Sequence, residues 1–274
     1  MNRLRPVEGM PLFKWLDDDH VTRLYVSLGL FMIASLVVFI PAMILDQRML
    51  DSSPVWIKPQ KFNLSLALHA LTLAVLVQLV PRDVRNGWAL MVFSYLAAAA
   101  LIFEYLVITI QAGRARRSHF NFETQIEALV YAAMGIGAVL LVLVALVLAI
   151  QIWRKGDRSR PGVWLGSIIG LSLGFAVTLV FASYMSNTGR YVGGPLEGGG
   201  AVIPLFGWSR EYGDLRPAHF VSLHMMQTVP FAGWLADRKN WNAKLVVLSV
   251  AGVQVALATF LFFQARAGQP IWPV

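Results

Sequence analysis

The sequence contains no cysteine among its 274 residues. Disulfide bonds, thiolate metal ligands and cysteine nucleophiles are therefore excluded, and a bound metal would need His, Asp or Glu ligands. Charged residues are also scarce, at 14% of the chain, whereas 57% of the residues are hydrophobic and the mean hydropathy is +0.61. Soluble domains typically carry about 25% charged residues. The composition therefore predicts a protein embedded in a lipid bilayer.

The net charge of +8 does not indicate a nucleic-acid partner, because the basic residues occur in short clusters between apolar runs. Such clusters are typical of the connections between membrane-spanning helices, where they set orientation and contact lipid headgroups. The first apolar run follows a polar leader and lacks a small-residue cleavage site, so we expect an uncleaved first span.

Seven stretches are long enough to cross a hydrocarbon core, which requires about 20 apolar residues. They are Arg23–Leu45, Phe62–Val80, Trp88–Gln111, Glu127–Trp153, Gly162–Met185, Phe220–Ala236 and Leu245–Ala265. The sequence therefore predicts an all-α membrane bundle of seven transmembrane helices over residues 23–267. Residues 1–22 would form either an amphipathic helix on the membrane surface or a solvated tail, and residues 268–274 a short C-terminal tail.

The distribution of basic residues predicts the orientation of this bundle. The N-terminal segment and the connections on its side carry 13 of the 23 Lys and Arg residues, and the longer connections on the opposite side carry 10. Cytoplasmic loops are enriched in basic residues, so we expect the N-terminus inside and the C-terminus outside. Three polar segments then share the outer face: Trp56–Phe62, Arg114–Glu123 and the long loop 186–218. Loops of that length are usually functional or disordered.

The fifth predicted span carries Gly162, Gly166, Gly170 and Gly174, at intervals of four. This spacing places them on one helix face, where small residues allow another backbone to approach closely. One interpretation is packing inside the bundle, and the alternative is a homo-oligomer that forms through this face.

Three ionisable residues lie at similar depths in three different predicted spans. A helix rises about 1.5 Å per residue, which places His69 about 12 Å, and Glu104 and His224 about 10 Å, below the outer ends of their helices. Ionisable groups at membrane depth are costly and are often functional. We therefore predict Glu104 and His224 as catalytic residues, and His69, Glu104 and His224 as metal ligands. For each of them the alternative is a structural hydrogen bond within the bundle.

Polar side chains near the outer ends of the spans are candidate ligand-binding residues: Lys58, Lys61, Gln111, His119, Asn121, Glu123, Asp214, Arg216, His219 and Gln227. For the two lysines, the alternative role is that of headgroup anchors whose charged ends reach the interface. His219 and His224 are five residues apart, so a regular helix would rotate them by about 140°, unlike the four-apart histidines of zinc-binding helices.

The motifs WIKPQKF (56–62), SHFN (118–121) and GWSREYGDLRPAHF (207–220), together with Glu104, resemble an uncharacterised bacterial family of seven-span integral membrane proteins. The similarity extends from about Trp56 to Trp234 and implies a multi-pass protein of the bacterial inner membrane, without a particular reaction. Ser65 and His69 also resemble the Ser-x-x-x-His of seven-span zinc hydrolases such as alkaline ceramidases and adiponectin-receptor-like proteins. Those enzymes use an Asp in the third span and a His-x-x-x-His in the last, and this chain departs from both.

Three functions are compatible with these patterns. The first is a membrane enzyme with an outward-facing site, containing either haem b ligated by His69 and His224 or a divalent metal such as zinc held by these residues and Glu104. The second is a binding protein, receptor or carrier for a small anionic or amphipathic molecule, with Lys58, Lys61 and Arg216 near the entrance. The third is a structural or assembly protein. The lipid bilayer is an expected partner in each case.

Overall fold

The structure, a computed structural model, describes residues 19–51, 53–195 and 199–273. The helices are α2 (His20–Val38), α3 (Ile40–Leu45), α4 (Ile57–Leu76), α5 (Arg82–Arg85), α6 (Trp88–Gly113), α7 (Gln125–Lys155), α8 (Pro161–Thr188), α9 (Arg216–Leu223), α10 (Met225–Lys239) and α11 (Ala243–Arg266), with the 3-10 turn η1 (Val77–Leu79). The short strands pair antiparallel, β1 (Met49–Leu50) with β2 (Ser53–Pro54) and β3 (Tyr191–Val192) with β4 (Gly213–Asp214).

Parts of three predicted segments lie outside the described residues. They are residues 1–18 of the N-terminal segment, residues 196–198 of the long loop, and residue 274 of the tail. The remainder of the long loop is held together by the β3–β4 pair and by a bridge between Val202 and Ser209.

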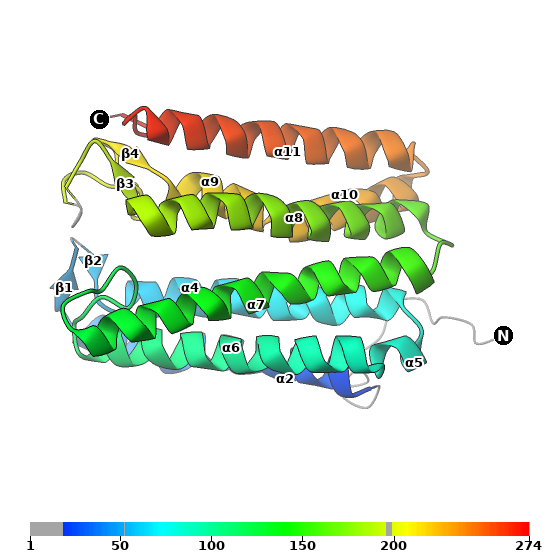
Figure 1. Cartoon of the computed structure of the whole chain (residues 1–274), viewed down its shortest axis with the longest axis horizontal. Coiled ribbons are helices and arrows are strands. Elements are labelled where there is room, and N and C mark those ends of the chain that lie inside the picture. Colours follow the sequence, from blue (N-terminus) through cyan, green and yellow to red (C-terminus); the bar gives the residue numbers. More distant parts are fainter. Residues whose placement is uncertain (1–18, 52, 196–198, 274) are drawn as a thin grey trace.

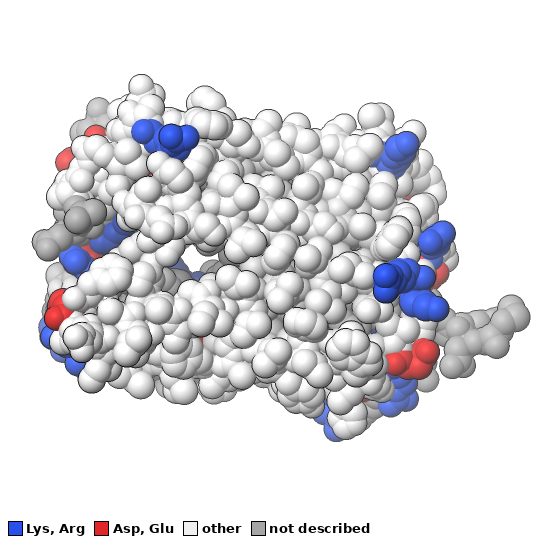
Figure 2. All heavy atoms as spheres, in the orientation of Figure 1, with Lys and Arg blue, Asp and Glu red and all other residues white. Residues whose placement is uncertain are grey.

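Within the described residues, six helical segments are long and apolar enough to cross a membrane. They are α2 with α3 (His20–Leu45), α4 with η1 (Ile57–Leu79), α6, α7, α8 and α11. Figure 2 shows that Lys and Arg side chains on this face lie towards the two ends of the molecule, with a broad band free of charge between them. A band of this kind matches the surface that a hydrocarbon core requires. The prediction of a helical, multi-pass membrane bundle is confirmed.

The predicted sixth span is made of two helices, α9 and α10, which are separated at His224. The backbone N–H of Gln227 donates to the carbonyl of His224 over 3.1 Å, which is a tighter turn than that of an α-helix. Polar residues in the pair, among them Ser222 and Thr228, keep it out of the six apolar segments. The pair nevertheless runs beside α8 from one end of the bundle to the other (Figure 1). The count of seven crossings stays a prediction.

The helices form two groups, each with its own apolar core. Helices α2, α4, α6 and α7 surround one core, which includes Met32, Leu73 and Leu101. Helices α8 to α11 surround the second, which includes Phe181, Val229 and Leu261. The groups lie one above the other in Figure 1 and are joined mainly by contacts between α7 and α8.

The glycine face of α8 packs against α10 of the same chain. A Cβ atom added to Gly166 would lie 2.7 Å from the carbonyl oxygen of Val229, and one added to Gly170 would lie 2.6 Å from that of Met225. A Cβ atom added to Gly162 would lie closer still to the carbonyl oxygen of Gly233. Only glycine permits these approaches. In this chain the face is therefore occupied by α10, and a homo-oligomer through it stays a prediction.

The end of the bundle near α5 is closed by a buried ion pair. Asp19 caps α2 by accepting a hydrogen bond from the backbone N–H of Thr22 over 2.9 Å. Its second oxygen accepts from Arg85 Nη1 over 2.7 Å, and Arg85 Nε donates to the carbonyl of Val80 over 3.1 Å. Asp19 is 1% exposed and Arg85 7%. Arg85 is therefore a structural residue and does not contact lipid headgroups.

Candidate functional site

The opposite end of the bundle, which we call the strand end, carries β1 to β4 and the connection between α6 and α7 (Figure 1). The predicted polar segments Trp56–Phe62 and Arg114–Glu123 and the described parts of 186–218 (186–195 and 199–218) lie there. The chemically varied loops therefore gather at one end of the protein, as the sequence predicted, and the candidate ligand-binding residues lie at this end.

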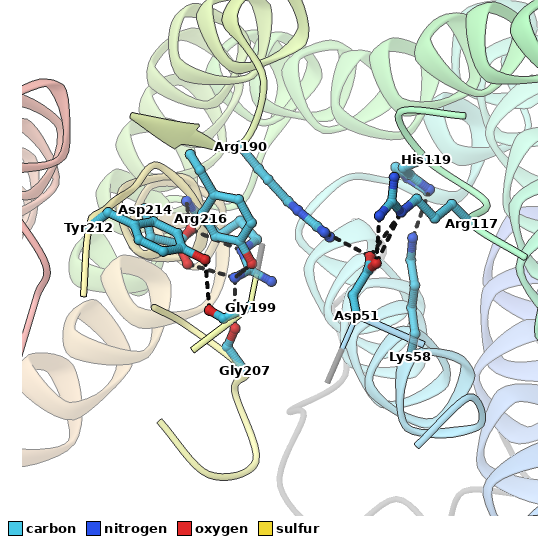
Figure 3. Close-up of polar contacts among 11 residues, drawn as sticks. Asp51, Lys58, Arg117, His119, Arg190, Gly199, Gly207, Tyr212, Asp214 and Arg216 are labelled. Carbon is cyan, nitrogen blue, oxygen red and sulfur yellow. Dashed lines mark hydrogen bonds and ion pairs between the residues drawn. The ribbon is translucent and has the colours of Figure 1, made fainter. Parts of the chain in front are cut away.

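The centre of this region is a line of three ionisable side chains from three elements. Lys58, in the first turn of α4, places its Nζ atom 3.3 Å from Nδ1 of His119 in the α6–α7 connection. On the other side of the imidazole, Nε2 lies 4.0 Å from Oε2 of Glu104 in α6. Figure 3 shows Lys58 extending towards His119. We call Lys58, His119 and Glu104 the polar line.

The proton on His119 can be assigned from its neighbours. Burial, together with electrostatic interactions with Lys58, His219 and Arg190, holds the pKa of His119 well below its usual value. The imidazole is therefore neutral at pH 7. When Lys58 is protonated, its ammonium can only donate, so Nδ1 accepts from it and the proton sits on Nε2, the nitrogen nearer to Glu104. His119 thus lies between a lysine and an acidic side chain without being charged itself.

Glu104 is buried with incomplete hydrogen bonding. It is 3% exposed, and among the described residues no donor reaches its Oε1 atom. Gly137 of α7 faces this oxygen, and a Cβ atom added there would lie 3.5 Å from it. A buried polar atom without a partner costs about 1–3 kcal/mol, and more when it is charged. This cost makes Glu104 a candidate for a group that binds something beyond the chain itself.

Asp51, in the turn between β1 and β2, ties the two helix groups together beside the polar line. Arg117 from the first group donates to it from Nη2 over 2.7 Å and from Nε over 3.1 Å, and Arg190 from the end of α8 donates from Nη2 over 2.7 Å (Figure 3). Burial alone would raise the pKa of Asp51, but the hydrogen bonds and charges of the two arginines outweigh it and lower the pKa. Asp51 is therefore an ionised clasp across the junction.

Asp214 and Arg216, both predicted as ligand-binding residues, stabilise the long loop instead. Arg216 Nη2 donates to Asp214 Oδ2 over 2.6 Å and to the carbonyl of Gly207 over 2.7 Å. The other carboxylate oxygen of Asp214 accepts from Arg216 Nε, while Oδ2 also accepts from the backbone N–H of Ser209. Lys61 plays a similar part, because its Nζ donates to the carbonyl of Phe206 over 3.0 Å. These contacts fold the loop over the strand end.

Three other candidate residues belong to a network at the start of α7. Gln111 Nε2 lies 3.5 Å from Glu127 Oε1, which also pairs with Arg116 over 2.6 Å. Glu123 is exposed and pairs with Arg116 over 3.0 Å. Asn121 is buried and bonds only to backbone groups of its own connection. The contacts of Gln111, Glu123 and Asn121 are structural, and the structure does not place these residues in the polar line.

Two further candidates in α9 and α10 have buried atoms without partners. His219 lies close enough to His119 to interact with it electrostatically, and its Nδ1 atom has no hydrogen-bond partner among the described residues. The Oε1 atom of Gln227 is also buried and has no hydrogen-bond partner among the described residues. His219 therefore extends the polar line towards the second helix group.

The predicted metal ligands His69, Glu104 and His224 are not brought together. His69 lines an apolar crevice of about 10 Å³ between α2, α4, α6 and α7, with Tyr25 and Leu141 among its neighbours. His224 binds the carbonyl of Phe220 through Nδ1 over 2.8 Å. Across the described residues no three His, Asp or Glu side chains lie close enough to share a metal ion.

His69 lies at a different depth from the predicted one because α4 starts earlier in the chain than expected. This helix begins at Ile57 and not near Phe62, so His69 lies about 18 Å from its start, deeper than the predicted 12 Å. Glu104 instead meets His119, a loop residue that reaches down to it.

Asp51, Arg117 and Arg190 were not singled out from the sequence. Asp51 and Arg190 are 139 residues apart, and no spacing pattern connects them. The one available signal was that Asp51 is an acid within the outer connection that precedes WIKPQKF. The chain matches no family model, and comparisons with curated proteins and with solved structures find no match either.

Proposed function

We propose that the chain is a membrane-embedded binding protein for a small amphipathic molecule that carries an anionic group. In this proposal Lys58 pairs with the anion and Glu104 accepts a hydrogen bond from a hydroxyl or amine of the same molecule. The observation that carries it is the polar line, a lysine and a carboxylate held apart by a neutral imidazole at the junction of two helix groups.

The charge around Lys58 favours an anion. Among the described residues no carboxylate oxygen lies within 4.0 Å of its Nζ atom, and its hydrogen-bonding neighbour is the neutral His119. Arg190 and Arg216 add positive potential nearby, which the negative charges of Glu104 and Asp51 partly offset. Opposite charges attract strongly in a site that contains little water. An anionic group next to Lys58 would therefore form a favourable ion pair with its ammonium group.

The shape of the junction favours an amphipathic ligand. Figure 2 shows a hollow in the surface between the two helix groups, nearer to the strand end and within the uncharged band. An opening at this position would face lipid chains in a bilayer. A molecule with an apolar tail could therefore enter sideways and place its head at the polar line.

The test begins with what the protein retains during purification. Wild-type protein and the Lys58→Met variant would be purified in a neutral detergent, and the small molecules extracted from each would be compared by mass spectrometry. We expect an anionic amphiphile in the wild-type extract that is at least tenfold depleted in the variant. Lys61→Met is the matched control, because Lys61 lies one turn away and donates to a loop carbonyl. Equal extracts from all three proteins would contradict the proposal.

A second candidate function is acid–base catalysis on the bound molecule, without a metal. His119 contacts Lys58 on one nitrogen and lies 4.0 Å from Glu104 on the other, and Ser118 Oγ lies 3.2 Å from Nδ1. A neutral imidazole next to a carboxylate is suited to proton transfer. If this function holds, His119→Gln will retain the amphiphile but stop its conversion. Retention without any conversion by the wild type would leave binding as the function.

We also propose the topology that the sequence predicts: seven crossings of a bacterial inner membrane, with the N-terminus inside. Its support is the path of α9 and α10 along the bundle and the excess of basic residues on the N-terminal side. The absence of native cysteine makes the test simple. A membrane-impermeant maleimide added to intact cells should label Phe122→Cys and not Ser159→Cys. The reverse pattern would contradict the orientation.

A further inference from the structure

A groove lies at the other end of the molecule, which we call the α7–α8 end. It has a volume of about 640 Å³ and is lined by residues from the start of α8, the end of α10 and the α10–α11 connection. Its chemically informative residues are Arg160, Trp234, Asp237, Arg238 and Trp241. The volume is within the range of about 300–1,000 Å³ that is usual for small-molecule sites. None of these residues belongs to the polar line.

The two arginines of the groove have no acidic partner. In the described part of the chain, the guanidinium groups of Arg160 and Arg238 make no hydrogen bond or ion pair, and Arg238 lies 5.3 Å from the ring centroid of Trp234. Asp237, the one acid among the residues that line the groove, already accepts hydrogen bonds from the backbone. Its two oxygens accept from the backbone N–H groups of Gly162 and Val163, each over 2.8 Å. The groove therefore has an excess of positive charge.

The aromatic lining indicates where the groove lies relative to a membrane. Trp241 is 54% exposed, and Trp234 stacks on Phe231, which is 61% exposed. Tryptophan is enriched at membrane interfaces, where its ring contacts acyl chains and its N–H contacts headgroups. The groove thus has apolar surface and two unpaired arginines at the level where lipid headgroups would lie.

From this combination we propose that the groove binds the headgroup of an anionic phospholipid. Arg160 and Arg238 pair with the phosphate, because a guanidinium matches phosphate oxygens in a two-point contact. Trp241 and Trp234 pack against the glycerol and the upper acyl chains. Basic pockets between helices at the membrane surface have this specificity. The assignment does not depend on the function of the polar line.

Native mass spectrometry of the full-length protein tests this assignment. The protein would be titrated with phosphatidylglycerol and, separately, with phosphatidylcholine, which has the same phosphate but no net charge. We expect tighter binding of phosphatidylglycerol to the wild type. The double variant Arg160→Gln with Arg238→Gln should lose about 10- to 30-fold in affinity for it, because each basic residue near the surface contributes a several-fold effect. Equal affinity of the wild type for the two lipids would overturn the proposal.

The matched control changes two charges at the same end, outside the groove. Arg154→Gln with Lys155→Gln removes them from the last turn of α7, and both residues are exposed. We expect this variant to bind phosphatidylglycerol within twofold of the wild type. A loss as large as that of the groove variant would mean that net charge, and not the groove, selects the lipid. The midpoint of thermal unfolding would show that both variants are folded.

Inorganic phosphate distinguishes a lipid headgroup from a soluble phosphate. Trp241→Ala should weaken binding of phosphatidylglycerol several-fold, because the tryptophan contacts the apolar part of the lipid. If inorganic phosphate instead binds at millimolar concentration, depends on the two arginines and is unaffected by Trp241→Ala, the groove is a soluble-anion site. That result would overturn the assignment to a phospholipid.

Discussion

Two clusters of buried ionisable side chains, one at each end of the bundle, differ in how far their hydrogen bonds are satisfied. At the α7–α8 end, Asp19 and Arg85 pair at 2.7 Å, and the neighbouring groups of Gln78 and Val80 complete their hydrogen bonds. At the strand end, within the described residues, one oxygen of Glu104 has no hydrogen-bond partner, and Lys58 has the neutral imidazole of His119 and the ring of Phe62 beside it. A satisfied cluster stabilises a fold, whereas an unsatisfied one costs stability. This difference distinguishes ionisable residues that stabilise the fold from ionisable residues that are candidates for a function.

The largest effect is expected at the satisfied cluster. Arg85→Met leaves Asp19 buried without its partner, and breaking a buried ion pair typically costs about 3–5 kcal/mol. We expect the free energy of unfolding, measured by denaturation in mixed detergent micelles, to fall by about this amount. The double variant with Asp19→Asn should recover part of the loss. If the free energy of unfolding of Arg85→Met changed by less than about 1 kcal/mol, the ion pair would not be a stabilising cluster and the two clusters would not differ as described.

The next largest effect concerns the contact between α8 and α10. Gly170→Ala places a methyl group 2.6 Å from the carbonyl oxygen of Met225, and overpacking of this kind typically costs about 1–3 kcal/mol. Gly252→Ala is the matched control in α11, because nothing lies within 4 Å of its added Cβ atom. That control should be neutral or slightly stabilising, since alanine favours a helix. Equal behaviour of the two variants in thermal unfolding would show that the glycine face is not tightly packed.

Because ionised Asp51 holds two arginines, the free energy of unfolding should depend on pH. The folded-state pKa of Asp51 is lowered, so its contribution is present above the usual carboxylate value and is lost as the pH falls through the folded pKa. Asp51→Asn should cost about 1–3 kcal/mol at pH 7, since it weakens charged hydrogen bonds to two arginines. The difference between variant and wild type should narrow below about pH 4. Thermal unfolding across pH 3–7 measures it, and a constant difference would contradict the account.

The smallest change in stability is expected at the polar line. Glu104→Gln removes a buried carboxylate that lacks a complete set of partners, so the free energy of unfolding should be unchanged or slightly increased. Unfolding under the conditions used for Arg85→Met gives a direct comparison. Destabilisation by 3 kcal/mol or more would mean that Glu104 is a structural residue like Arg85.

Much of the fold could be predicted from the sequence, because long apolar runs leave few alternatives to a helix in a bilayer. The exception is the α9–α10 pair, where polar side chains and the break at His224 weaken the signal. The site was less predictable. Lys58, His119 and Glu104 were each identified from their polarity, but their grouping required the true start of α4 and the path of the α6–α7 connection. Neither follows from helix periodicity.

The most direct test of the account is whether an anionic amphiphile stabilises the protein through Lys58. Thermal unfolding in a neutral maltoside would be measured with increasing laurate, with dodecyltrimethylammonium as the oppositely charged control. A ligand that binds only the folded state at 100 times its dissociation constant stabilises by about 2.7 kcal/mol. We predict that laurate stabilises the wild type and Lys61→Met but not Lys58→Met. Equal stabilisation of all three proteins, or by both amphiphiles, would contradict the proposal that the strand end binds an anionic head.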